Sequence, residues 1–167
     1  MSPEEPNTRR ILETLRRREV RFVVIGAIAA VAQGYPLPTF DLDVTPDPRD
    51  DNLRNLAAAL RDLDAKLRTP SGDVDFPVDA AMLRTTGVWT LATNAGDLDL
   101  VFEPAGTTGY DDLRRDALTL DLGSGEVLVA SLLDVIRSKE AANRPKDQAQ
   151  LPALRETLER VRARQGR

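Results

Sequence analysis

The chain has 167 residues, a length that suits one domain and is too short for two ordinary ones. It contains no cysteine and no histidine, which excludes disulfide frameworks, thiolate zinc sites, cysteine nucleophiles, histidine bases and Ser-His-Asp triads. The net charge of −4 is unevenly distributed: residues 1–21 carry six Arg against four Glu, residues 137–167 carry nine Lys and Arg against four Asp and Glu, and the middle of the chain is acidic.

Helical and strand patterns alternate through the first half of the chain. The β-branched run VRFVVIG, for example, ends in glycine and is typical of a buried strand. In chain order we expect a helix over 7–19, this strand over 20–26, a short helix over 27–33, a half-buried strand over 39–45 and a helix from Asp47-Pro48 to about Leu63.

The second half begins with residues 69–79, which are rich in Pro, Gly and Asp and predict a loop. After it we expect a short helix over 79–84, a hairpin of strands 88–93 and 97–102, a helical turn over 110–115, a second hairpin within 118–130, a helix capped by Ser131 that runs to about 142, and a last helix from Pro145 to about Arg164. The pattern predicts one α/β (α+β) domain over 1–167, with a core over about 20–130 and a helical C-terminal part over about 131–165.

The sharpest chemical feature is Gly26-Ala27 followed, after thirteen residues, by Asp41-Leu42-Asp43. Residues i and i+2 of a strand share a face, so Asp41 and Asp43 can reach one ion, and oxygen ligands suit Mg²⁺. Gly26 closes a strand and opens a helix, where free backbone N–H groups and the lack of a side chain favour phosphate. A metal pair beside a phosphate seat is what nucleotidyl transfer requires.

This pattern resembles the polymerase-beta-like nucleotidyltransferase superfamily, whose signature is a strand, Gly-Gly or Gly-Ser, and then Asp-x-Asp. Thr39 also stands two residues before the first Asp, as in many small members. The stretch SLLDVIRSKEAANRPKDQAQL resembles the later segment of the small AbiEii-type and MenT-type toxin nucleotidyltransferases. The matching positions there are Lys139, Arg144, Lys146 and Asp147.

The resemblance implies a small mixed sheet flanked by helices and a third carboxylate on a neighbouring strand. Asp97 and Asp99 share one face of the strand 97–102, and Asp99 is favoured because it is central. Asp41, Asp43 and Asp99 would then hold Mg²⁺, or alternatively Mn²⁺, with Asp99 as general base. The expected phosphate-binding and nucleotide-binding residues are Gly26, Ala27, Thr39, Lys139, Arg144, Lys146 and Asp147, and Lys139 is also expected to be catalytic.

The resemblance implies two substrates, a nucleoside triphosphate such as ATP and an acceptor hydroxyl on RNA such as a tRNA 3′ end. It also implies a cognate antitoxin as protein partner. No apolar run approaches the ~18 residues of a membrane span, and no signal-peptide pattern opens the chain. We therefore expect a cytoplasmic protein with no membrane partner.

Two departures from the family pattern leave alternatives open. Ala27 replaces the usual Gly or Ser, and Leu37 stands where many relatives have Arg. The same chemistry on a protein or small-molecule acceptor such as an antibiotic is one alternative, and a catalytically weak nucleotide-binding module is another. A haloacid-dehalogenase-type phosphatase fits Asp41-x-Asp43-x-Thr45 only superficially, because no hydrophobic strand leads into Asp41.

Overall fold

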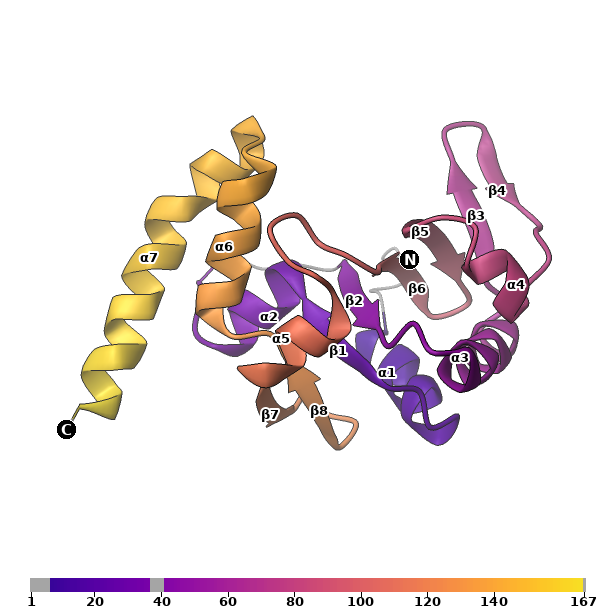
Figure 1. Ribbon diagram of the computed structural model, residues 1–167, viewed down its shortest axis with the longest axis horizontal. Coiled ribbons are helices and arrows are strands. Elements are labelled where there is room, and N and C mark those ends of the chain that lie inside the picture. The colour runs from indigo at the N-terminus through magenta and orange to yellow at the C-terminus, as the bar shows by residue number, and fades with distance from the viewer. Residues whose placement is uncertain (1–6, 37–40, 167) are drawn as a thin grey trace, which may run out of the picture.

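A computed structural model describes residues 7–36 and 41–166 of the chain (Figure 1). The helices are α1 (Thr8–Arg17), α2 (Gly26–Ala32), α3 (Asp50–Asp62), α4 (Ala80–Leu83), α5 (Tyr110–Arg115), α6 (Leu132–Ala142) and α7 (Pro145–Gln165). The strands are β1 (Phe22–Ile25), β2 (Leu42–Pro46), β3 (Lys66–Thr69), β4 (Gly72–Val74), β5 (Val88–Thr93), β6 (Gly96–Val101), β7 (Leu118–Asp121) and β8 (Glu126–Val129). The predicted α/β class with a mixed sheet is confirmed.

The strands form one sheet in the order β4-β3-β5-β6-β2-β1-β8-β7. β2 pairs in parallel with β6 and β1 pairs in parallel with β8, whereas the remaining pairs are antiparallel. The central strands β1, β2 and β6 therefore lie side by side. Ile25 stands opposite Asp43, and Asp43 stands opposite Asp99. This register places carboxylates from distant parts of the sequence at one position in the sheet.

The core is aliphatic, as a chain with only 4% aromatic residues requires. Helices α1 and α3 pack on each other, and each fully buried leucine contributes roughly 2 kcal/mol through its removal from water. The fully buried large side chains are Ile11, Leu12, Leu15, Leu42, Leu53, Leu56, Leu60, Leu63, Leu83, Leu91, Leu98 and Leu100. Trp89 is also buried and stacks on Phe76, with ring centroids 5.3 Å apart, so it belongs to the packing.

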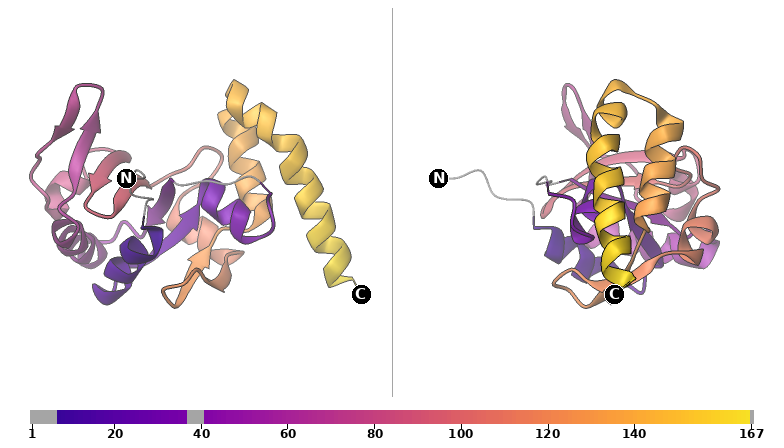
Figure 2. Two further views of the ribbon diagram at one scale, coloured as in Figure 1. Left: turned by 180° about the vertical axis from the view of Figure 1, so that it is seen from behind. Right: turned by 90° about the vertical axis from the view of Figure 1, so that its left-hand side faces the viewer.

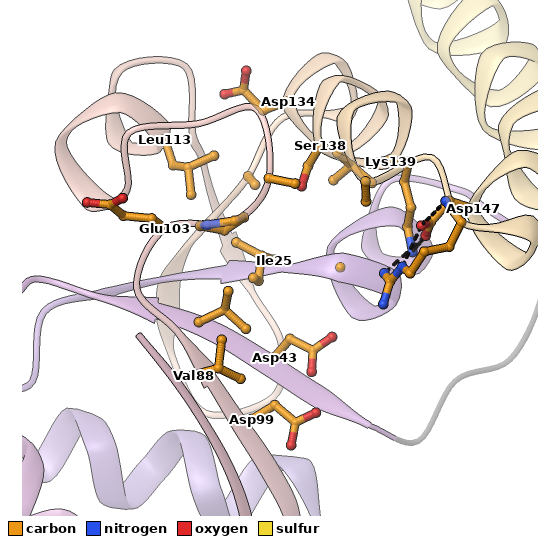
Figure 3. A pocket seen from close by; sticks show the side chains of 18 of the residues that line it. Ile25, Asp43, Val88, Asp99, Glu103, Leu113, Asp134, Ser138, Lys139 and Asp147 are labelled. Carbon is orange, nitrogen blue, oxygen red and sulfur yellow. Dashed lines mark hydrogen bonds and ion pairs between the residues drawn. The ribbon is translucent and has the colours of Figure 1, made fainter. Parts of the chain in front are cut away.

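Helices α6 and α7 form a packed helical hairpin at one end of the sheet (Figures 1 and 2). Ser131 caps α6 by accepting a hydrogen bond from the Asp134 backbone N–H at 3.1 Å. Asn143 ends α6 with φ of +52°, a conformation that asparagine tolerates, and Pro145 begins α7. The tight connection brings Lys139 and Asp147 to the same cavity as Asp43 and Asp99 (Figure 3).

The structure differs from the predicted loop over 69–79, because β3 and β4 form a hairpin there. The hairpin strands carry Lys66, Arg68 and Asp73 and lack the apolar alternation that reveals a half-buried strand. Backbone pairing of β3 with β5 holds the hairpin at the sheet edge. No helix within residues 7–36 or 41–166 combines the length and apolar character needed to cross a membrane.

Candidate active site

A cavity of about 570 Å³ opens at the end of the central strands, beneath the 103–105 loop and the helical hairpin. Strands β1, β2 and β6 contribute Ile25, Asp43 and Asp99, and the hairpin contributes Lys139 and Asp147 (Figure 3). Elements from residues 25 to 147 thus meet at one place. The cavity is large enough for a nucleotide-sized ligand.

Asp43 and Asp99 project into this cavity from adjacent parallel strands. Burial, together with the neighbouring charges of Asp99 and Asp41, raises the pKa of Asp43 to about 7, and the Lys139 ammonium opposes this shift only in part. Burial also raises the pKa of Asp99, although Arg68 pulls it down. Like charges held together in a partly buried place are costly, so this pair favours a bound cation.

Asp41 directly precedes β2 and is exposed, and its charge acts on both other carboxylates. The described part of the chain contains no ready-made cluster of three carboxylates that could hold a metal ion. Two close carboxylates nevertheless fit Mg²⁺, because this ion commonly uses one or two carboxylates and completes its shell with substrate phosphates and water. The strained Asp43–Asp99 pair therefore fits a divalent cation.

Gly26 touches the carboxylate of Asp43. Its φ is +67°, and a Cβ atom added there would lie 2.6 Å from Asp43 Oδ2. The glycine is therefore required for two reasons: the backbone adopts a left-handed conformation, and the Asp43 side chain occupies the space of a side chain. The sequence predicts that Gly26 binds phosphate, whereas in the structure the Asp43 carboxylate lies against this glycine.

Replacing Gly26 with alanine is expected to leave the protein folded but to impair its metal site. The positive φ costs roughly 1–2 kcal/mol for alanine, and the new methyl group displaces the Asp43 carboxylate. Calorimetric titration with Mn²⁺ should show at least about tenfold weaker binding. The matched control is Gly87→Ala, because a Cβ at Gly87 meets no atom within 4 Å. Unchanged Mn²⁺ affinity in Gly26→Ala would contradict the assignment.

Cationic side chains line the opposite wall of the cavity. Lys139, Arg144 and Lys146 come from the end of α6 and the start of α7. Lys139 Nζ lies 3.4 Å from Asp147 Oδ1, and its side chain is 18% exposed. Arg144 also pairs with Asp147, at 2.7 Å from Nε to Oδ2, but remains more than half exposed. The cavity therefore has an anionic wall on the sheet and a cationic wall at the α6–α7 connection, and Glu103 and Asp134 line it as well.

Asp147 itself is fully buried and is surrounded by donors. It accepts hydrogen bonds from the side chain and the backbone N–H of Arg144, and it pairs with Lys139. The Arg144 hydrogen bonds, with help from Lys139, lower the pKa of Asp147 to about 2 despite its burial. Asp147 thus anchors the cations and the first turn of α7 rather than offering a free oxygen.

The remaining residues of the predicted site are Thr39, Ala27 and the alternative carboxylate Asp97. Thr39 lies outside the described residues. Ala27 follows Gly26 in the first turn of α2 and is not part of the described cavity wall. Asp97, the alternative third carboxylate, stands opposite Ala92 and pairs with Arg68 at 3.0 Å, whereas Asp99 is the one beside Asp43.

Sequence reasoning missed several residues at or beside the cavity, among them Arg68, Val88 and Glu103. Arg68 contacts Asp99, but it lies on a strand with no apolar signal. Val88 is exposed at the start of β5, and Glu103 follows β6, and both line the cavity. A valine at a strand start and a glutamate after a strand are too common to indicate a site by themselves.

No protein-family description matches this chain, and no curated protein does. Solved structures with the same fold include a Thermotoga maritima protein proposed to be a nucleotidyltransferase, with a TM-score of 0.54, 16% identity, and coverage of 91% of this chain and 90% of that one. They also include the antibiotic-resistance factor ANT(2'')-Ia, with a TM-score of 0.54, 14% identity, and coverage of 92% and 85%. This likeness confirms the predicted nucleotidyltransferase fold, whereas the resemblance to toxins stays a prediction.

Proposed function

We propose that this protein is a magnesium-dependent nucleotidyltransferase that transfers a nucleoside monophosphate from a nucleoside triphosphate to an acceptor hydroxyl. The observation that carries the proposal is the division of one cavity into two walls. Asp43 and Asp99 form the anionic wall and Lys139 stands on the cationic wall (Figure 3), where Arg144 also lines the cavity. A metal-bound triphosphate has the complementary charges, because its cation suits the carboxylates and its phosphates suit the ammonium and guanidinium groups.

Asp43 and Asp99, with Asp41 beside them, would hold Mg²⁺, or Mn²⁺ in its place. When bound, such an ion neutralises phosphate charge and orients the reacting oxygens. Lys139 binds the β- and γ-phosphates and so holds the leaving group. Arg144 and Lys146 add positive charge at the cavity rim, where they are exposed. Gly26 keeps the Asp43 carboxylate in place.

The reaction forms a bond between the acceptor oxygen and the α-phosphorus, and it breaks the bond from that phosphorus to the oxygen bridging to the β-phosphorus. Pyrophosphate leaves against the cationic wall. Asp99 accepts the proton of the acceptor hydroxyl, a role that suits a carboxylate whose pKa is raised by burial. The anionic wall therefore accepts the proton, and the cationic wall binds the leaving pyrophosphate.

We further propose RNA, with a tRNA 3′ end as the leading candidate, as the acceptor of a cytoplasmic toxin that a cognate antitoxin controls. Exposed arginines support this choice, because phosphate backbones bind to such groups. They lie on α1 and α7, at Arg9, Arg10, Arg16, Arg17, Arg155, Arg160, Arg162 and Arg164. A small-molecule acceptor is the second candidate, and the shared fold with an antibiotic-resistance factor favours it.

The test is incubation with each α-labelled nucleoside triphosphate and Mg²⁺, together with separate pools of RNA, protein and small hydroxylated antibiotics. The proposal expects pyrophosphate release and label in the RNA pool. Label confined to antibiotics or protein would overturn the RNA acceptor and leave the transfer chemistry intact. Triphosphate binding without transfer to any pool would favour a nucleotide-binding module.

Replacing Lys139 with methionine is expected to weaken triphosphate binding and slow transfer, together by about 10²-fold in kcat/KM. Methionine keeps the apolar stem but removes the ammonium that faces the carboxylate wall. Lys66→Met is the matched control, because Lys66 pairs loosely with Asp75 on β3 and is not among the residues that line this cavity. Steady-state kinetics with varied triphosphate decides the matter: equal kinetics for Lys139→Met and wild type would refute this role.

A further inference from the structure

Arg68 connects the β3–β4 hairpin to the carboxylate strand of the cavity. Its Nη2 lies 3.1 Å from Asp99 Oδ1, and its Nη1 lies 3.0 Å from Asp97 Oδ2. Nη1 also donates a hydrogen bond to the Leu91 backbone oxygen at 3.2 Å. One guanidinium thus spans two carboxylates that share a face of β6 and a carbonyl of β5.

These contacts hold one oxygen of Asp99 in a set direction. The guanidinium is planar and its donors form a rigid fork, so it restricts a carboxylate more than an ammonium does. The Arg68 side chain is 32% exposed and the Asp99 side chain 29%, so both groups are partly withdrawn from water. The contact therefore both orients Asp99 and stabilises its ionised form beside Asp43.

Asp97 takes a defined part in this arrangement. It stands two residues before Asp99 on the same face, but its partner is Arg68 rather than Asp43. Both terminal nitrogens of Arg68 contact these carboxylates, so its positive charge is directed at β6. The chain of contacts runs from Asp97 through Arg68 to Asp99 and ends at the carboxylate pair.

We propose that Arg68, anchored by Asp97, is a positioning residue that fixes the Asp99 carboxylate for proton acceptance and cation binding. The inference rests on the proposed nucleotidyl transfer and assigns its base a support. It does not make Arg68 a catalytic residue, because Arg68 acts through Asp99. Removal of the support should therefore slow the chemical step more than it weakens triphosphate binding.

The kinetic test compares Arg68→Ala, Arg68→Lys, Asp97→Asn and the double variant Arg68→Ala/Asp97→Asn with wild type. We expect Arg68→Ala to lower kcat about 10²-fold with KM for the triphosphate changed less than about threefold. Arg68→Lys should recover part of kcat, and the double variant should be no slower than Arg68→Ala, since Asp97 acts through Arg68. Lys66→Ala is the control, because Lys66 lies on the same face of β3 and pairs loosely with Asp75.

Two kinetic results would overturn the inference. A raised KM with unchanged kcat would make Arg68 a substrate-binding residue, and wild-type kinetics in Arg68→Ala would leave it with no part in the reaction. With either result the wild-type protein still transfers nucleotide, so the proposed function stands.

A thermal-unfolding cycle of Arg68→Ala, Asp99→Asn and their double variant tests the contact without any activity. The expected result is that Arg68→Ala lowers the melting temperature less in the Asp99→Asn background than in wild type, since Asp99→Asn has already removed the contact. Independent, additive shifts would show that Arg68 does not hold Asp99. If wild type transfers no nucleotide, the proposed function fails and this cycle alone decides the positioning contact.

Discussion

Asp43→Asn is expected to lose nucleotidyl transfer by about 10³-fold or more while gaining thermal stability. Activity falls because an amide lacks the charge that a divalent cation requires. Stability rises because wild type keeps a half-buried carboxylate beside Asp99 and Asp41, an arrangement that raises the pKa of Asp43 to about 7. The gain should be roughly 2 kcal/mol at pH 8 in the absence of metal.

The pH dependence of this gain has a definite sign. Between pH 3.8 and about 7 the unfolded state loses the Asp43 proton while the folded state keeps it, so wild-type stability falls as pH rises through this window. Asp43→Asn escapes that loss, and its advantage should vanish near pH 4 and level off above pH 7. Asp73→Asn, an exposed change on β4, is the control. Thermal unfolding from pH 4 to 8 measures the effect, and a destabilised Asp43→Asn would contradict this account of the carboxylate pair.

Asp147→Ala is expected to destabilise the fold by about 3–5 kcal/mol, because it strips a fully buried carboxylate from Arg144 and Lys139. The loss is large against a total stability of about 5–15 kcal/mol. It also removes the acceptor for the Arg144 backbone N–H at the start of α7. Denaturant unfolding at pH 7 measures the change.

A matched control exists in the same helical hairpin. Glu140 and Arg155 form an exposed pair at 2.9 Å, so Glu140→Ala should cost about 0–1 kcal/mol. Because the pKa of Asp147 is lowered to about 2 from 3.8, its stabilisation is present above pH 3.8 and disappears as pH falls toward 2. The difference between wild type and Asp147→Ala should shrink in that window. Equal effects of the Asp147 and Glu140 substitutions would show that burial gives Asp147 no special weight.

The sequence predicted those elements that carry a periodic apolar signal. The predicted positions of the strand 88–93 and of the helix capped by Ser131 match the structure, because alternation and capping chemistry are local properties. The β3–β4 hairpin was not expected, since strands at a sheet edge can be polar and owe their pairing to β5. Edge pairing is a tertiary effect that leaves little trace in composition.

Some contacts of the candidate site also follow from local sequence patterns, whereas others depend on the tertiary structure. The pairing of Asp43 with Asp99 follows from strand alternation once β2 and β6 are neighbours, but that adjacency depends on sheet order. The close contact between Gly26 and Asp43 and the reach of Arg68 from β3 depend on distances between segments far apart in sequence. Rules based on the spacing of residues in the sequence cannot predict such contacts. Asp147 was expected near phosphate, and only its burial shows that it anchors Lys139 and Arg144 instead.

The central claim is most directly tested by following both ends of the triphosphate during one reaction. Wild type is incubated with Mg²⁺ and either α-labelled or γ-labelled nucleoside triphosphate in the presence of total tRNA, beside Asp43→Asn as the inactive control. The account predicts that α-label enters the acceptor, that γ-label leaves as pyrophosphate, and that chelation of Mg²⁺ or the Asp43→Asn substitution stops both. Transfer of γ-label, or undiminished transfer of α-label by Asp43→Asn, would contradict it.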